Sequence, residues 1–586
     1  MAARALLLLT LVSAGPPPAA PSPPPPAAAA PADKALAVRL EPFRFLAGAP
    51  PAGWTDPSFD DRAWSGPAPG PFTPRRPPLP GSAEAPAGTT LFDAVAGQPL
   101  LLRARFALAD ARRARVLELR VAYSDGFVAY VNGREVARRA IAPTATLAAV
   151  PHGPEVERVY VAVPSPALPA LNADANLLAV AIYPYAGRNA VVPTAPEAAV
   201  GVAAASGVRI VRGPYLAAPS EAKAKARLSV IWETDLPATG KVVADPATGA
   251  AAAGGARTES TRAAATRQVV ELNALARGVA YRYRVEVAAA PGDTAASVPA
   301  RFETVPAPPA PMRFAVYGDM RYPGHDSHRT VVEALVREAP PLVINTGDLT
   351  DEGSQESNWQ RYFDVTAPLG AIAPVIPALG NHDAARAGTG AAKAWALFGM
   401  PTPAPPFYTS FDLGGVHLVV LDTNDGGGAQ RDWLTDDLAR ARRHGARAVF
   451  AFCHEAPWSH GLHGNEHRMI RDYAPLLAGG GVDVLFSGHD HIYERGTGAT
   501  PAGKLTYVVT GGGGAPLYNP RCQAASGPPP GDVPRALRPC PPTVAALTKT
   551  YHYIMVTVAA DRIEMCPKRP DGSAVEPCVR LPPHRR

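Results

Sequence analysis

The chain has 586 residues, too many for a single hydrophobic core, and its length predicts roughly three or four domains. The net charge is only +6, and the chain contains no long run of lysine or arginine, so the sequence does not imply a nucleic acid as a structural partner. Proline occurs 68 times, more than twice the average share of about 5%, which indicates many linkers and loops.

The N-terminus has the pattern of an export signal. Residues 1–15 combine a basic start at Arg4, a short apolar stretch and a small-residue exit, which is typical of a secretory signal peptide. Residues 16–34 are almost entirely proline and alanine and indicate an extended spacer. No later apolar run reaches the about 18 residues that a membrane span needs. The sequence therefore predicts a secreted or periplasmic protein without a membrane span.

Cysteine usage agrees with export. Four cysteines form an even set near the C-terminus, and four cysteines allow three pairings. We favour the pairs that close the shortest loops, Cys522–Cys540 and Cys566–Cys578. Cys453 is left over and precedes His454 on a predicted strand. Neighbouring side chains on a strand point to opposite faces, so we expect a buried free thiol that faces away from His454.

Residues 35–204 show short alternations of apolar and polar residues separated by turns, which predicts an all-β sandwich. At Gly53–Trp64 and Ser124–Val136 this segment resembles galactose-binding-like jelly-roll domains. Many such domains bind sugars, so a carbohydrate is a possible partner. We favour a packing role, because the loop residues that would bind a sugar are not recognisable.

Residues 207–305 predict a second β-sandwich of about seven strands. This segment resembles the fibronectin-III-like domain that precedes the catalytic domain of plant-type purple acid phosphatases. The resemblance is carried by Gly213–Tyr215, Ile231–Thr234 and Tyr281–Arg284. The proline-rich residues 305–311 then form a linker.

Residues 312–561 alternate apolar runs with helical stretches, for example over 329–338 and 430–443, which predicts an α/β domain. Residues 562–586 follow as a C-terminal tail closed by a disulfide. The expected fold class is therefore multidomain, with two N-terminal all-β sandwiches followed by an α/β domain.

Five apolar runs of this α/β domain end in residue types that bind metals. Strand ends at one edge of a sheet lie close together, and ligands gather there in α/β proteins. The two histidines of the last run are two residues apart, so on extended backbone they would point the same way. The residues that follow the five runs are Asp319, then Asp348, then Asn381-His382-Asp383, then His454, and finally His489 and His491.

This ordered set resembles the calcineurin-like metallophosphoesterase superfamily, in particular its purple acid phosphatase branch. Gly488–Arg495 and Val508–Pro516 also match that branch. The resemblance implies a β-sandwich flanked by helices that holds two transition metal ions, with Fe, Zn or Mn as candidates. The implied ligands are Asp319 and His491 for the first metal, Asn381, His454 and His489 for the second, and Asp348 as the bridge. His382 would orient the phosphate or protonate the leaving oxygen.

Two positions depart from that family pattern. Arg321 stands where many members have His or Gly, and a guanidinium cannot be a metal ligand. Arg321 would instead hold a phosphate oxygen, or else be a surface arginine paired with an acid. His328 or His325 would then supply the missing nitrogen. Asp351 stands where purple enzymes have the tyrosine that gives their colour, so we expect a colourless protein.

Four further residues receive weaker expectations. His463 lies in the loop after His454, where it either contacts the substrate or is solvated. His417 lies inside an apolar strand and is expected to be a satisfied core histidine. We assign no role to His552. We expect Asp490 to face away from the metals and to tolerate replacement.

The sequence thus predicts a secreted binuclear metal-dependent phosphoesterase that acts on a small phosphorylated substrate. We expect a phosphomonoesterase, and a phosphodiesterase or nucleotide hydrolase is the alternative on the same site. The alternative of another class is a carbohydrate-binding surface protein whose phosphoesterase domain is only a scaffold.

Overall fold

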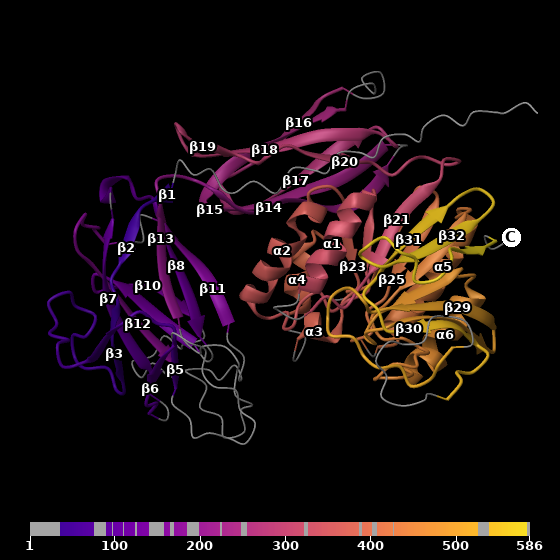
Figure 1. Ribbon diagram of the computed structural model, residues 1–586. Helices are drawn as coiled ribbons and strands as arrows, with labels where there is room; N and C mark the ends of the chain where they lie inside the picture. Colours follow the sequence, from indigo (N-terminus) through magenta and orange to yellow (C-terminus); the bar gives the residue numbers. More distant parts are fainter. Residues whose placement is uncertain are drawn as a thin grey trace, which may run out of the picture.

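The computed structural model describes residues 35–74, 89–95, 98–108, 110–123, 126–139, 157–164, 169–183, 199–222, 225–247, 255–321, 326–385, 390–400, 407–425, 427–524 and 538–582. The expected signal peptide and proline-rich spacer lie outside these residues. In the part of the chain that is described, no helix is both long enough and apolar enough to cross a bilayer. Three β-rich units follow one another along the chain (Figure 1).

The first unit packs a four-stranded sheet, ordered β1-β13-β8-β11, against a seven-stranded sheet, ordered β10-β9-β12-β7-β3-β4 with β2 beside β7. Strand β12 is buried along its whole length between β7 and β9. A parallel pair, β5 and β6, completes the unit. The strands are β1 Ala35–Leu36, β2 Val38–Leu40, β3 Phe43–Ala47, β4 Ser65–Ala68, β5 Phe72–Pro74, β6 Thr90–Phe92, β7 Leu100–Leu108, β8 Val116–Tyr123, β9 Gly126–Val131, β10 Arg134–Arg139, β11 Glu157–Pro164, β12 Asn176–Tyr183 and β13 Ala199–Ala205, with a 3-10 turn at Ala111–Arg113.

The aromatic residues that carry the jelly-roll resemblance lie inside this unit. Trp54 and Trp64 stack on each other and are buried. Both pack in one cluster with Leu101 and Leu177. Their burial favours the packing role expected for this segment.

The second unit is built around one 22-residue strand, β15. The first half of β15 pairs with β14 and β17, and its second half pairs with β16 and β18. The single strand therefore belongs to both faces of a sandwich, whose core contains Trp232 and Tyr281. The strands are β14 Ile210–Ala222, β15 Lys225–Pro246, β16 Arg257–Ser260, β17 Ala265–Leu275, β18 Ala280–Ala290, β19 Asp293–Ala296 and β20 Ala300–Glu303.

The third unit faces two sheets against each other. One sheet has the order β23-β22-β21-β31-β32-β33, and the other has the order β24-β25-β26-β27-β29-β28-β30. Phe314 of the first sheet meets Phe450 of the second edge to face, at 5.3 Å between ring centroids. The strands are β21 Met312–Tyr317, β22 Val343–Asn345, β23 Val375–Pro377, β24 Thr409–Leu413, β25 Val416–Val420, β26 Ala448–Phe452, β27 Val484–Ser487, β28 Tyr493–Thr500, β29 Gly503–Thr510, β30 Val544–Thr548, β31 Tyr553–Val558, β32 Ile563–Lys568 and β33 Val579–Leu581.

Helices flank this sandwich, as the family resemblance implies (Figure 1). They are α1 Asp326–Glu338, α2 Glu356–Gly370, α3 Asn381–Ala384, α4 Ala391–Leu397, α5 Ala429–Arg443 and α6 Ala474–Gly479, with a π-helical turn at Met469–Tyr473. The residues expected to form a separate tail instead add β32 and β33 to the first sheet. Alternating burial along β32 explains this, because Ile563 and Met565 face the core.

Both expected disulfides are present, Cys522–Cys540 and Cys566–Cys578, and Cys453 is a buried free thiol as predicted. The Cys566–Cys578 pair ties β32 to the strand that follows it. Nearby, Glu576 accepts two hydrogen bonds from the Arg495 guanidinium, at 2.7 and 2.8 Å. These contacts fix the C-terminal segment to β28.

The second unit is docked firmly onto helices α2 and α4 of the third. The hydroxyl of Tyr215 donates to the Leu397 carbonyl at 2.7 Å, and Arg212 pairs with Glu356 at 2.6 Å. Tyr215 and Ile231 belong to the same buried cluster as the core of the third unit. The two units therefore share one core.

Candidate metal centre

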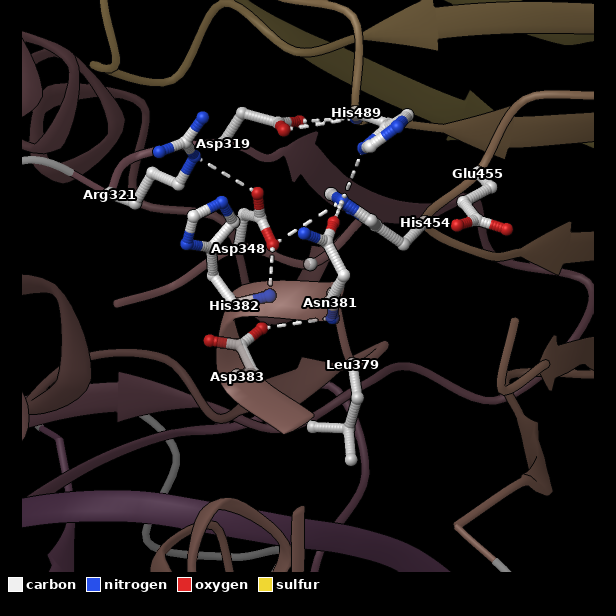
Figure 2. Close-up of polar contacts among 12 residues, drawn as sticks. Asp319, Arg321, Asp348, Leu379, Asn381, His382, Asp383, His454, Glu455 and His489 are labelled. Atoms are coloured by element: carbon white, nitrogen blue, oxygen red, sulfur yellow. Dashed lines mark hydrogen bonds and ion pairs between the residues drawn. The ribbon is translucent and has the colours of Figure 1, made fainter. Parts of the chain in front are cut away.

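The five predicted strand ends meet at one place. Strands β21, β22 and β23 run parallel in the first sheet, and β26 and β27 run parallel in the facing sheet. Their C-terminal ends bring together Asp319, Asp348, Asn381, His454 and His489, with His491 close behind. Figure 2 shows most of these side chains converging from both sheets. The expected convergence is confirmed.

The backbone at the site is bent, with unusual torsion angles. Asp319, Asp348 and His489 have φ values of 59°, 53° and 69°, a region that non-glycine residues rarely adopt. Such conformations persist where surrounding contacts enforce them, and they cluster at functional sites. His489 is therefore not on extended backbone, so the premise from which His489 and His491 were expected to point the same way does not hold.

Neighbouring glycines allow the loops to approach so closely. A Cβ atom on Gly380 would lie 2.1 Å from Oδ1 of Asp348, and one on Gly488 would lie 2.2 Å from Oδ2 of Asp319. Both are shorter than any real contact, so these two positions require glycine.

Asp319, Asp348 and His491 form one buried group whose donor atoms all lie within 4.8 Å of one another. Nε2 of His491 is 3.5 Å from Oδ1 of Asp319. This nitrogen is buried, and the described residues offer it no hydrogen-bond partner. Nδ1 of the same ring donates to the Pro516 carbonyl at 2.7 Å, which leaves the Nε2 lone pair directed at the carboxylates. A metal ion would satisfy this nitrogen.

His454 stands at the centre of a second group. Its Nε2 lies 3.1 Å from Oδ1 of Asn381, 3.2 Å from Nδ1 of His489 and 3.3 Å from Oδ1 of Asp348. Nδ1 of His454 donates to the Thr346 carbonyl at 2.9 Å. Two imidazole nitrogens that face each other need a cation or proton between them. The donor set is again nitrogen and oxygen, which fits Fe, Zn or Mn.

The electrostatics of the centre also favour a cation. Burial raises the pKa of Asp319 well above its ordinary value. Burial alone would lower the pKa of His454, but the facing Asp348 carboxylate raises it to about 10. Burial lowers the pKa of His489 to about 2 and that of His491 to about 4, so both rings are neutral, as metal ligands must be.

The two predicted substrate-contacting residues lie beside this group. Nδ1 of His382 donates to the Asp351 carbonyl at 2.7 Å, and the His382 backbone N–H donates to Asp348 at 3.1 Å. Nε of Arg321 is 3.1 Å from Oδ2 of Asp348. Figure 2 shows both side chains next to Asp348. Arg321 is thus paired with acids, as one of the two expectations for it stated, and it lies beside the candidate centre.

His328 lies in the first turn of α1, where its ring packs between Tyr317 and Tyr362, at 6.2 and 6.1 Å between ring centroids. It is not part of the Asp319, Asp348 and His491 group. His325, the alternative source of the missing nitrogen, lies outside the described residues. Helix packing rather than the centre holds the His328 side chain.

The sequence assigned no role at the site to three residues that shape it. Asp383 is buried and accepts backbone hydrogen bonds from Leu349, Thr350 and Gly380, which join the loops of Asp348 and Asn381. The Tyr518 ring stacks on the His491 ring at 4.0 Å between centroids, and the Tyr518 hydroxyl accepts a hydrogen bond from Arg321. The Gly-rich motif ending at Pro516 was the nearest sequence signal for Tyr518.

Asp490 is the third such residue. Its carboxylate faces away from the metal ligands, as expected, but it is buried and accepts hydrogen bonds from Ser459 and from the backbone of His463 and Gly464. The loop it holds places the His463 ring 3.9 Å from that of His489. These contacts argue against the expected tolerance to replacement.

Two further histidines, His417 and His552, have hydrogen-bond partners within the protein. His417 bridges Asp412 and Asp437 at 2.7 and 2.8 Å and is fully buried, which confirms it as a core histidine. His552 is buried between Thr510 and Thr550, at 3.0 and 2.9 Å.

Comparison with known proteins agrees with this geometry. The Calcineurin-like phosphoesterase family model matches residues 312–493. Purple acid phosphatase 23 of Arabidopsis thaliana is 30% identical over 258 residues, covering 36% of this chain and 55% of that protein. Purple acid phosphatase 18 of the same plant is 26% identical over 204 residues, covering 32% of this chain and 46% of that protein. The chain thus spans about half the length of these curated relatives.

Among solved structures, the purple acid phosphatase PPD1 from yellow lupin (Lupinus luteus) seeds superposes with a TM-score of 0.55 at 15% identity. The match covers 82% of this chain and 93% of the lupin chain, so the likeness in fold extends well beyond residues 312–493.

Proposed function

We propose that this chain, whose residues 312–493 form a calcineurin-like phosphoesterase domain related to that of purple acid phosphatases, hydrolyses phosphate esters at a centre of two metal ions. One observation carries the proposal. Five strand ends from two facing sheets deliver oxygen and nitrogen donors to one buried place, and Nε2 of His491 is left there without a partner among the described residues.

The proposed ligands fall into two groups that share Asp348. Asp319 and His491 would hold one metal, and Asn381, His454 and His489 would hold the other. When bound, such metals supply a hydroxide nucleophile and offset the charge on the phosphoryl oxygens. The backbone carbonyls of Thr346 and Pro516 fix which nitrogen His454 and His491 present to the centre.

His382 and Arg321 would act on the substrate itself. The Asp351 carbonyl holds the His382 ring through Nδ1, which leaves Nε2 for a phosphate oxygen or the departing oxygen. His463, stacked on His489, borders the same space. Arg321 brings a permanent positive charge to the side of Asp348.

We expect a phosphomonoester as the substrate, with phosphodiesters or nucleotides as the alternative on the same site. We also propose that the protein is exported, either secreted or periplasmic. Two disulfides support export, because such bonds persist in oxidising compartments. The burial of Trp54 and Trp64 gives no support to a sugar-binding role for the first unit.

Metal analysis combined with hydrolysis assays tests this function. The purified full chain should carry close to two transition metals and hydrolyse at least one of a monoester, a diester and a nucleotide. Asn381→Ala should lower the metal content and reduce kcat by at least about 10³-fold, because it removes a donor at the reacting centre. Asn358→Ala is the matched control, since Asn358 hydrogen-bonds within helix α2 and its start. A metal-free protein that binds sugars and hydrolyses none of the three substrates would refute the proposal.

A further inference from the structure

Arg321 is fixed at the edge of the centre by its backbone as well as its side chain. Its backbone N–H donates to the Asp348 carbonyl at 3.0 Å, which ties the first strand-end loop to the second. Its side chain is 19% exposed, whereas Asp348 is almost fully buried. The guanidinium therefore lies between the buried ligands and the solvent from which a substrate arrives.

Two further residues hold the Arg321 guanidinium through hydrogen bonds. Nη1 donates to Oδ1 of Asp351 at 3.4 Å, and Nη2 donates to the Tyr518 hydroxyl at 3.3 Å. The Tyr518 ring is itself held by stacking on His491, with an angle of 15° between the rings. Each terminal nitrogen of arginine carries a second N–H group. Arg321 is thus held in position while it retains donors for an incoming anion.

Asp351 links the two groups that would contact a substrate. Its carboxylate accepts from Arg321, and its carbonyl accepts from Nδ1 of His382. Figure 2 shows the Arg321 guanidinium and the His382 ring on the same side of Asp348. One residue therefore sets the spacing of both side chains.

The chemistry of phosphate esters makes this arrangement selective. A monoester has three terminal oxygens and about two negative charges near neutral pH, because its second pKa is about 6. A diester has two terminal oxygens and one negative charge, and a second substituent takes the place of the third oxygen. A fixed guanidinium forms charged hydrogen bonds with the third oxygen but gains none from an ester substituent.

We propose that Arg321, positioned by Asp351 and Tyr518, binds the third terminal oxygen of a phosphomonoester and makes the site prefer monoesters to diesters. This inference rests on the proposed function and names its substrate class. Arg321 contacts the substrate, whereas Asp351 and Tyr518 act through Arg321 as positioning residues.

The test compares kcat/KM for p-nitrophenyl phosphate and bis(p-nitrophenyl) phosphate at equal metal content. In Arg321→Gln the ratio of monoester to diester kcat/KM should fall about 30-fold or more, since one charged contact in the transition state is lost. Arg321→Lys should fall between Gln and wild type, because lysine keeps the charge but not the fork of donors. Asp351→Asn and Tyr518→Phe should shift the same ratio less, by about 3- to 10-fold.

An equal loss of both activities in Arg321→Gln would overturn the inference, because Arg321 would then act only on the shape of the metal cluster. A titration with inorganic phosphate separates this inference from the proposed function. If the wild type hydrolyses neither ester, the proposed function fails, yet Arg321→Gln should still bind phosphate about 10-fold more weakly than wild type. Equal phosphate affinity in the two proteins would refute the role of Arg321.

Discussion

Two clusters of buried polar side chains in this chain differ in whether the cluster contains its own cation. In the first unit, Arg103 is 2% exposed. Its guanidinium is surrounded by the carbonyls of Trp54, Asp56 and Phe59 and by the carboxylate of Asp61, which lies 2.8 Å from Nε. In the third unit, carboxylates and imidazoles crowd together, and nitrogens of His454 and His489 face each other at 3.2 Å.

The Arg103 cluster contains its own cation, the guanidinium, which donates hydrogen bonds to the surrounding oxygens. The candidate metal centre contains donors that point at one another or at no partner among the described residues. Burial and polarity therefore do not by themselves distinguish a functional site. The distinguishing feature is a group of buried polar atoms at one place for which the described residues provide no complementary partner.

The test with the largest expected effect replaces two histidines separately. One has a ring nitrogen without a partner among the described residues, and the other has both ring nitrogens hydrogen-bonded. His491→Ala should lose at least one metal per chain and reduce kcat by at least about 10³-fold, because it removes a donor whose lone pair has no other use. His552→Ala should keep both metals, since Thr510 and Thr550 satisfy both nitrogens of His552. Elemental analysis and kcat measure the difference. Equal metal loss in the two variants would remove the distinction.

The converse test disrupts the self-contained cluster. Arg103→Ala should lower the free energy of unfolding of the first unit by about 3 kcal/mol, because carbonyls and a carboxylate lose their buried partner. Metal content and kcat should stay at wild-type values, since Arg103 lies in a different unit. Thermal or urea unfolding together with metal analysis measures both. A loss of metal in Arg103→Ala would show that the two clusters are coupled.

Replacing Asp490 tests the candidate centre without removing a proposed metal ligand. Asp490→Ala should reduce kcat/KM by about 10- to 100-fold while metals are retained, because the loop carrying His463 loses three hydrogen bonds. Amide hydrogen exchange at His463 and Gly464 should become faster in this variant. Asp490→Asn keeps the shape and should be milder. Wild-type activity and exchange in Asp490→Ala would restore the expectation that this position tolerates replacement.

His417 predicts a dependence of stability on pH that does not involve metals. Burial lowers its pKa, but hydrogen bonds to Asp412 and Asp437 outweigh that effect and raise the pKa to about 9. The folded pKa exceeds the unfolded value, so the stabilisation is complete below about pH 6.5 and is lost as the pH rises towards 9.

The stability advantage of wild type over His417→Gln should therefore shrink by up to about 3 kcal/mol between pH 6.5 and 9. Urea unfolding of the two proteins across this range, with metal held constant, gives the difference. A pH-independent difference would mean that His417 is neutral in the folded protein.

Colour is the smallest expected effect. The family resemblance places Asp351 at the position of the colour-giving tyrosine. Its carboxylate accepts a hydrogen bond from Arg321, so we expect the metal-loaded protein to show no strong visible absorption band. Tyr518 offers a phenol near the centre, and its hydroxyl accepts from Arg321. A visible band that disappears in Tyr518→Phe would contradict the prediction and identify Tyr518 as a ligand.

Short-range sequence patterns were enough to predict which candidate ligands gather at the site. Each candidate ligand lies two to four residues after the end of an apolar strand, so the order of apolar runs and donor residues was enough to predict that Asp319, Asp348 and His454 lie together. The contacts of Asp490 and Tyr518 depend on loops that return from distant parts of the chain, and no periodicity encodes such returns. The C-terminal strands were missed because β33 is only three residues long and a disulfide pattern suggested a loop.

Because the second and third units share one core, we expect them to fold together. Residues 312–493 match the phosphoesterase family, yet β21 at their start pairs with β31, which lies beyond their end. A chain cut to those residues would leave one side of β21 unpaired and expose the core residues that pack against Tyr215 and Ile231. The smallest piece that melts as one cooperative body should therefore run from about residue 207 to about residue 581, and calorimetry of the whole protein should record those two units in a single transition.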